Sequence, residues 1–310
     1  MSISSNCPRG FGSCGGWLRF LQKRVLLVSC AVWALAGEVL AEPVSPKGRR
    51  ETHDWITPMR VLARDFKGED GKVLRLGDSI TYANPGSAYS RYGKDRTPEQ
   101  LAVCRWMKAD VRGKASGVWL SIDDQPGGRS HTAASGVTTA QFLAGGKGGL
   151  PKLDDLIREH NPQIACVLLG TNDLNARQRP EAFAANLESI ILRLLANKTI
   201  PVLTTVPPLR GKAEQALEYN ERIWKLAVQH NVPVADYHGE IMARRPGDWD
   251  GTLISRDGVH PSAGETAGPA TEANLGQSGY LLFSWTVLNK LMEIKREVID
   301  RKGAGSAVKP

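Results

Sequence analysis

The feature of this 310-residue chain that most restricts its fold is a regular alternation of short apolar segments with longer amphipathic ones. The apolar segments are rich in β-branched residues and are bounded by Gly, Pro or Asn, which is typical of buried strands. They lie at residues 73–76, 118–122, 164–169, 200–206 and 232–235. These five segments therefore predict the strands of one sheet.

Helix-like segments occupy the intervals between strands, at residues 98–109, 151–160, 180–197 and 213–230. The first three begin with Pro, which suits the first turn of a helix. A repeated order of strand and helix is typical of parallel strands joined by right-handed crossovers. We therefore expect an α/β fold: a doubly wound, flavodoxin-like and mainly parallel five-stranded sheet with helices on both faces. An amphipathic segment at 280–298 predicts a C-terminal helix.

The first 41 residues have the order of a secretory signal peptide. Basic side chains precede an apolar run at 25–37, and small residues at 39–41 allow cleavage before Glu42. The alternative is an uncleaved membrane anchor, but this apolar run is shorter than the roughly 20 residues that span a bilayer. We expect no stable membrane insertion after cleavage. Residues 27–30 also resemble a lipoprotein cleavage box, and lipidation of Cys30 is the less favoured alternative. We expect a secreted or periplasmic protein.

The chain is expected to have four parts: a signal peptide at 1–41, an extended lead-in at 42–65, one domain at 66–300 and a flexible tail at 301–310. Its net charge is +8, and loss of four basic residues and one acidic residue with the signal peptide leaves +5. That charge is too small to indicate a nucleic-acid partner. Of the five Cys, three leave with the signal peptide, and two are too few for a disulfide framework.

Polar residues with catalytic potential follow the predicted strands, where the active groups of such sheets lie. Ser79, in a Gly-Asp-Ser-Ile-Thr sequence, follows the first strand, and a turn there would expose its hydroxyl as a nucleophile. A Ser that only caps a helix is the alternative. Near the end of the domain, Asp257 precedes His260 by three residues. A loop of this length can place the carboxylate under one ring nitrogen, which makes His260 a positioned general base.

Two further positions could stabilise negative charge on a substrate oxygen. Asn172, in the Gly-Thr-Asn-Asp sequence after the strand at 164–169, can donate a hydrogen bond from its side chain. Its alternative role is to cap the helix that begins near Pro180. Gly136 follows a Gly-rich loop and can offer its backbone N–H to the same pocket, although it could also be an ordinary turn glycine. Gly127 and Gly128 compete with it for this role.

Taken in this order, the blocks around Ser79, Gly136, Asn172 and His260 resemble the SGNH, or GDSL, hydrolase superfamily over about residues 73–264. The resemblance implies that Ser79 is the nucleophile, His260 the base and Asp257 its orienting partner. It also implies an oxyanion hole made by the N–H groups of Ser79 and Gly136 and by the Asn172 side chain. Two segments, 84–130 and 266–279, depart from the family pattern and could shape the pocket.

The resemblance implies a serine esterase that cleaves a carboxylic ester through an acyl-enzyme and needs no cofactor and no metal. With the export signal, it suggests a small-molecule or polysaccharide ester as the substrate, such as an acetylated polysaccharide. A lysophospholipase, a thioesterase and an O-acetyltransferase are alternatives with the same catalytic groups. A non-catalytic carbohydrate-binding protein is an alternative of another class, but it would not need Ser79, Asn172, Asp257 and His260 together.

Overall fold

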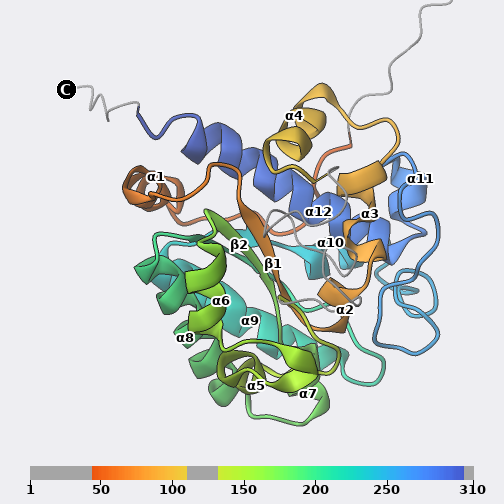
Figure 1. The fold of residues 1–310 in the computed structure, drawn as a ribbon. Coiled ribbons are helices and arrows are strands. Elements are labelled where there is room, and N and C mark those ends of the chain that lie inside the picture. The colour runs from red at the N-terminus through yellow and green to blue at the C-terminus, as the bar shows by residue number, and fades with distance from the viewer. Residues whose placement is uncertain (1–43, 110–131, 304–310) are drawn as a thin grey trace, which may run out of the picture. The chain divides into compact units, whose positions relative to one another are not determined.

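A computed structural model describes residues 44–109 and 132–303 of the chain. Its centre is a parallel sheet in which the strands follow the order β1-β2-β3-β4 (Figure 1). The strands are β1 (Val73–Gly77), β2 (Ile164–Leu168), β3 (Ile200–Thr204) and β4 (Val234–Ala235). The α/β fold with a mainly parallel sheet is confirmed.

The predicted number of five strands is corrected to four for the described part of the chain. The predicted strand at 118–122 lies outside the described residues. The edge of β1 that faces away from β2 carries a single parallel bridge, between Gly77 and Ala133. β4 is also shorter than predicted, because Asn231 adopts a left-handed conformation at the end of the preceding helix and the chain joins the sheet only at Val234.

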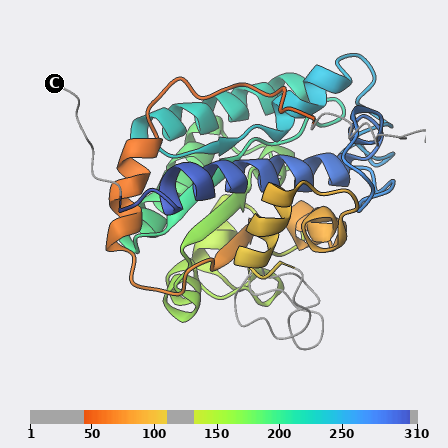
Figure 2. The ribbon, with the colours of Figure 1, turned by 90° about the horizontal axis from the view of Figure 1, so that it is seen from above.

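Helices connect and cover the strands, as the order of the sequence predicted (Figures 1 and 2). The longest are α8 (Pro180–Ala196), α9 (Ala213–His230) and α12 (Gly279–Ile294), which continues into a π-helical turn, η4 (Lys295–Ile299). The others of eight or more residues are α1 (Ile56–Asp65), α3 (Pro85–Tyr92), α4 (Pro98–Trp106), α6 (Leu153–His160) and α10 (Tyr237–Arg244). The short ones are α2 (Ser79–Tyr82), α5 (Thr139–Ala144), η3 (Lys147–Gly149), α7 (Thr171–Asn175) and α11 (Glu272–Leu275).

Two groups of helices lie on opposite faces of the sheet. Helices α8 and α9 pack against each other and against β3. On the other face, α12 contacts β4 and packs against α3, α4 and α10, and α1 lies beside η4 at its far end (Figure 2). Every residue of the four strands is buried, as expected for a sheet covered on both faces. The described part of the segment at 84–130 forms α3 and α4, so it packs on α12.

The lead-in at 42–65 is not extended throughout, because residues 56–65 form helix α1. Apolar residues in this segment recur at helical spacing, and Met59 and Ala63 are buried in the core with the preceding Trp55. The prediction was wrong here because the charged and Pro-rich residues at 42–53 dominated the composition of the whole segment. The helix belongs to the domain's core.

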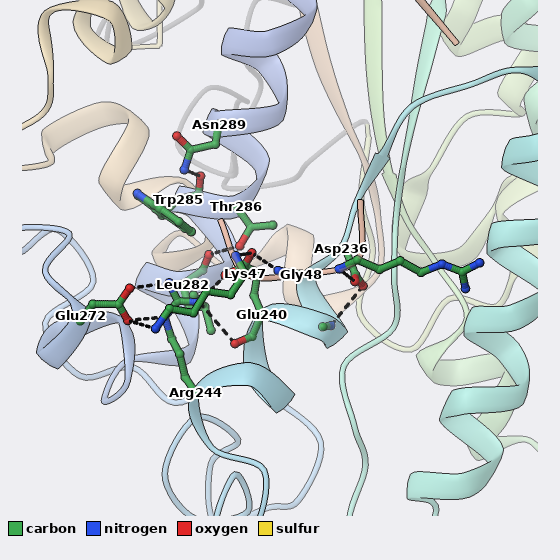
Figure 3. Close-up of polar contacts among 12 residues, drawn as sticks. Lys47, Gly48, Asp236, Glu240, Arg244, Glu272, Leu282, Trp285, Thr286 and Asn289 are labelled. Carbon is green, nitrogen blue, oxygen red and sulfur yellow. Dashed lines mark hydrogen bonds and ion pairs between the residues drawn. The ribbon is translucent and has the colours of Figure 1, made fainter. Parts of the chain in front are cut away.

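The extended part before α1 is held by two acidic side chains (Figure 3). The backbone N–H groups of Lys47 and Gly48 both donate to Glu240 Oε1 at 2.7 Å, and that of Arg49 donates to Asp236 Oδ2 at 2.6 Å. Glu240 also pairs with Arg244, and both side chains are nearly fully buried. These contacts join the segment to the end of β4 and to α10.

Several predictions concern residues outside the described ranges, among them the signal peptide and most of the tail. No helix in residues 44–109 and 132–303 combines the length and the apolar composition needed to cross a membrane. Cys104 and Cys166 are both buried and are not joined in a disulfide. Burial raises the pKa of Cys166 to about 12, so this thiol is unreactive at neutral pH.

Candidate active site

Ser79 lies where β1 turns into the short helix α2, at the carboxyl edge of the sheet. Asp78 caps this helix with its side chain, so Ser79 is the first helical residue and not the cap. The turn is tight because Gly77 has no room for a side chain: a Cβ there would lie 2.6 Å from the carbonyl oxygen of Leu168 in β2. This packing leaves Ser79 half-buried at the edge of the sheet.

The three residues predicted to act as nucleophile, base and orienting acid meet at this point. The Oγ atom of Ser79 is 2.9 Å from Nε2 of His260. The other ring nitrogen of His260, Nδ1, is 2.7 Å from Oδ2 of Asp257. Because Nδ1 donates its proton to a carboxylate, Nε2 can accept the proton of the serine hydroxyl. The geometry is that of a serine activated by a histidine base.

Asp257 is held as an anion by hydrogen bonds from its own loop. Its Oδ1 atom accepts from the backbone N–H groups of Val259 (2.8 Å) and His260 (2.9 Å) and from the Ser255 hydroxyl (2.7 Å). Burial alone would raise the pKa of this carboxyl, but these donors and the His260 ring lower it well below its ordinary value. Asp257 therefore stays charged throughout the pH range in which a histidine base works.

The loop that carries His260 is anchored to the segment before it and to the start of α12. Ile254 forms an antiparallel bridge with Pro261, and the Ser262 N–H donates to the Leu253 carbonyl at 2.9 Å. The Ser278 hydroxyl, which caps α12, donates to the Ala263 carbonyl at 2.8 Å. The end of the segment at 266–279 therefore contacts the chain directly after the catalytic loop.

The side chain of Asn172 points into the same region from α7, the short helix after β2. Its Nδ2 atom donates to the Val137 carbonyl at 3.1 Å and to Asp78 Oδ2 at 3.3 Å. Asn172 therefore does not cap the helix at Pro180, as one alternative held. Its amide therefore lies next to Asp78, the neighbour of Ser79.

Gly136 lies in the turn before α5, one residue from the carbonyl that Asn172 contacts. Its φ of +73° is in the left-handed region that favours glycine. A Cβ at this position would lie 3.7 Å from the Nζ atom of Lys147, so the turn itself is not crowded. The structure thus places Gly136 beside Asn172. The competing Gly127 and Gly128 lie outside the described residues.

Sequence reasoning did not single out Asp173, the residue after Asn172. This carboxylate is fully buried and accepts from the N–H (3.0 Å) and the hydroxyl (2.5 Å) of Thr139, the first residue of α5. It therefore ties the Gly136 turn to the helix of Asn172. Burial raises the pKa of Asp173. No local signal in the sequence marks this role, because Thr139 lies 34 residues away.

Within residues 44–109 and 132–303, no group of three or more His, Cys, Asp and Glu side chains is placed to hold a metal ion. The hydrogen-bonded chain from Asp257 to Ser79 contains a histidine that can act as a base and a serine that can act as a nucleophile. The chemistry that this arrangement can perform is acyl transfer to a serine hydroxyl.

Asp78 gives the site a pH-dependent contribution to stability. Burial raises the pKa of this fully buried carboxyl to about 6, above the ordinary 3.8 that it would have in the unfolded chain. Between these values the unfolded state has lost the proton and the folded state has kept it, so the free energy of unfolding should fall as pH rises. The expected loss from pH 4 to pH 6.5 is about 2 kcal/mol.

This loss can be measured as the difference in unfolding free energy between the wild type and Asp78→Asn at each pH. Asparagine stays neutral, so the variant should gain stability relative to the wild type as pH rises from 4 to 6.5. Asp155→Asn, at an exposed position on α6, is the matched control and should give a much flatter difference. A flat difference for Asp78→Asn as well would show that burial does not perturb Asp78.

Comparison with known proteins agrees with this geometry. Residues 76–264, more than half of the chain, match the GDSL-like lipase/acylhydrolase family. The thioesterase 1/protease 1/lysophospholipase L1 of Escherichia coli K12 is 27% identical over 164 residues, which cover 50% of this chain and 72% of that protein. Residues 76–264, the region that matches the family, contain Ser79, Gly136, Asn172, Asp257 and His260.

Solved structures show the same fold at low sequence identity. A carbohydrate esterase of family 3 from Talaromyces cellulolyticus superposes with a TM-score of 0.51 at 17% identity, covering 73% of this chain and 98% of that one. An acetyl esterase solved with an acetate ion gives a TM-score of 0.50 at 17% identity, with the same coverage of 73% and 98%. The chain therefore belongs to the GDSL-like lipase/acylhydrolase family and is a serine ester hydrolase.

Proposed function

We propose that this enzyme hydrolyses a carboxylic ester through an acyl-enzyme on Ser79, with His260 as the general base and Asp257 as its orienting partner. The observation that carries the proposal is the continuous hydrogen-bonded chain from Asp257 Oδ2 through the His260 ring to Ser79 Oγ. Both links have the length of ordinary hydrogen bonds, and the serine lies at the carboxyl edge of a parallel sheet.

The reaction follows from these positions. His260 accepts the hydroxyl proton at Nε2 while Ser79 Oγ bonds to the ester carbonyl carbon, and the carbonyl oxygen becomes negative. Collapse of this intermediate expels the alcohol, which takes the proton from His260. Water then attacks the acyl-enzyme by the same route and releases the acid. The charge on Asp257 stabilises the imidazolium that forms in each half of the reaction.

The negative oxygen is proposed to be bound by the N–H groups of Ser79 and Gly136 and by Nδ2 of Asn172. Without substrate, the Asn172 amide donates to Val137 and, at the longer distance of 3.3 Å, to Asp78. A substrate oxygen would replace the longer contact while the bond to Val137 keeps the amide oriented. Such pre-oriented donors are worth most when charge develops in the transition state.

Replacing Asn172 by alanine should lower kcat by about 10²- to 10³-fold, the cost of removing one oxyanion donor. KM should change little, because the ground-state carbonyl interacts more weakly with this donor. Steady-state kinetics on p-nitrophenyl acetate measure both constants. Asn175→Ala, at an exposed position on the same helix, is the matched control and should keep kcat. A near-normal kcat with a lowered melting temperature would mean that Asn172 is only structural.

For the substrate, we favour a small acyl group, such as an acetyl group on a polysaccharide. The support is the shared fold with a carbohydrate esterase and an acetyl esterase. The similarity to the Escherichia coli thioesterase and lysophospholipase favours a second candidate, the hydrolysis of thioesters or lysophospholipids. The two proposals differ in the acyl chain that the pocket accepts.

A series of p-nitrophenyl esters from acetate to palmitate separates these substrates, together with acetate release from acetylated xylan and other acetylated glycans. The favoured proposal requires kcat/KM to fall as the acyl chain lengthens and acetate to appear from a glycan. A kcat/KM that rises with chain length would support the thioesterase or lysophospholipase alternative instead. Ser79→Ala, measured in parallel, gives the background rate.

We also propose that the enzyme acts outside the cytoplasm, after removal of residues 1–41. The support is the order of basic, apolar and small residues before Glu42. N-terminal sequencing of the exported protein should begin at or near Glu42. An exported protein that still carries Met1 would contradict the proposal.

A further inference from the structure

We propose that Arg210, in the loop between β3 and α9, is a positioning residue that holds the catalytic loop 255–260 in its reactive geometry. The inference rests on the proposed roles of Asp257 and His260. Within the described structure, every hydrogen bond that the Asp257 carboxylate accepts comes from its own loop. Those bonds shape the loop, but they do not attach it to the sheet. A contact from another part of the fold is therefore needed to hold this loop in place.

Arg210 makes the attachment with both its main chain and its side chain. Its backbone N–H donates to the Gly258 carbonyl at 2.9 Å, and Nη1 of its guanidinium donates to the Arg256 carbonyl at 2.8 Å. These two carbonyls flank Asp257 on either side. One residue that follows β3 therefore fixes the backbone immediately before and after the residue that orients His260.

The Arg210 side chain is itself held in one orientation by Asp250. Nε lies 2.6 Å from Oδ2 and Nη2 lies 2.7 Å from Oδ1, so the planar guanidinium meets the carboxylate through two parallel bonds. The hydrogen bond from Arg210 lowers the pKa of Asp250, which keeps this partner charged. Asp250 also pairs with Ile254, which in turn pairs with Pro261 beyond His260. The Arg210–Asp250 pair is therefore connected to the end of the catalytic loop through the backbone of Ile254.

Gly258 shows how closely the loop packs on Arg210. Its φ is +76°, and a Cβ built at this position would lie only 2.6 Å from Cβ of Arg210. A glycine is needed for the conformation and for the approach. The contact buries Gly258 although its neighbours Arg256 and Asp257 are exposed. Catalysis requires the imidazole to stay within a fraction of an ångström of its reactive position. The packing of Gly258 against Arg210 restricts the movement of the exposed loop that carries this imidazole.

Two other roles for Arg210 are testable alternatives. An exposed ion pair contributes little to stability, so the Arg210–Asp250 pair could be a surface contact without consequence. The cation could also bind the substrate directly. The substitution Arg210→Lys separates these roles from positioning. Lysine keeps the positive charge but lacks the planar guanidinium, which bonds Asp250 and the Arg256 carbonyl at the same time.

The experiment compares Arg210→Lys, Asp250→Asn and the double variant by steady-state kinetics on p-nitrophenyl acetate, by the rate of Ser79 labelling with a fluorophosphonate, and by melting temperature. Positioning predicts that each single variant lowers kcat and the labelling rate by about 10- to 100-fold with little change in KM. The double variant should have about the same kcat and labelling rate as either single variant, because both substitutions break the same Arg210–Asp250 contact. Arg222→Lys, in the pair with Glu181 between α9 and α8, is the matched control and should keep kcat.

Each other outcome overturns the inference. Wild-type kcat in Arg210→Lys and Asp250→Asn would make the pair a surface contact. A raised KM with unchanged kcat would make Arg210 a substrate contact. A lowered melting temperature with normal kcat would make its role structural. Failure of the wild type to be labelled at Ser79 would instead refute the proposed function, so the two failures are distinguishable.

Discussion

Replacing Ser79 by alanine should lower kcat by roughly 10⁶-fold, because nucleophile and base act as a unit and loss of either removes the covalent route. The remaining activity would come from binding and from the oxyanion donors alone. The substitution removes one oxygen atom from a half-buried position, whose partner in the structure is His260 at 2.9 Å. The fold should therefore be kept, and KM should stay close to that of the wild type.

The control for this experiment is Ser87→Ala on α3, where the hydroxyl donates to the Asn84 carbonyl one turn earlier. It should keep kcat. A fluorophosphonate should label the wild type and Ser87→Ala, and peptide mapping should find the adduct on Ser79. Labelling of Ser79→Ala at another serine, or retained ester hydrolysis by this variant, would show that the nucleophile has been assigned incorrectly.

The sequence predicted the central elements of the fold because their signals are local. The buried strands are short, largely apolar runs, and helices α8 and α9 have bounds within one residue of those predicted. Both helices have an apolar face and a clear end, which are properties of neighbouring residues in the sequence. The short helices α2 and α7 were not predicted, because four or five residues show no periodicity and their helical form depends on the sheet edge.

The same distinction applies to the site. Ser79, Asn172, Asp257 and His260 could be found because each lies in a short block of characteristic residues. Asp173 and Arg210 could not, because their partners are 34 and 40 residues away in the sequence and only the packed loops bring them together. Gly136 is an intermediate case: its block was visible, but its position beside Asn172 depends on the buried bonds of Asp173.

The role of Asp257 leads to the second large effect. Asp257→Asn should lower kcat by about 10⁴-fold, the size expected when the carboxylate of a Ser-His-Asp triad is lost. The Asn oxygen can still accept from the N–H groups of Val259 and His260, so the loop should keep its shape. Its amide, however, would donate to Nδ1 of His260 and place the ring proton on Nε2. That tautomer cannot accept the proton of Ser79.

The argument is tested by comparing the kinetics of Asp257→Asn with those of Asp248→Asn. Asp248 is an exposed carboxylate on the preceding turn that forms an ion pair with Arg245. The control should keep kcat and its melting temperature, whereas Asp257→Asn should melt at a lower temperature because it loses the stabilisation that the charged carboxylate provides. Asp257 has a lowered pKa, so its stabilising effect is complete above about pH 4 and is lost only as pH falls through its folded-state value. A decline in wild-type activity above pH 4 therefore cannot be assigned to Asp257. A near-normal kcat in Asp257→Asn would mean that some other group orients His260. The contacts of Arg210 with the carbonyls on either side of Asp257 would then have no importance for catalysis.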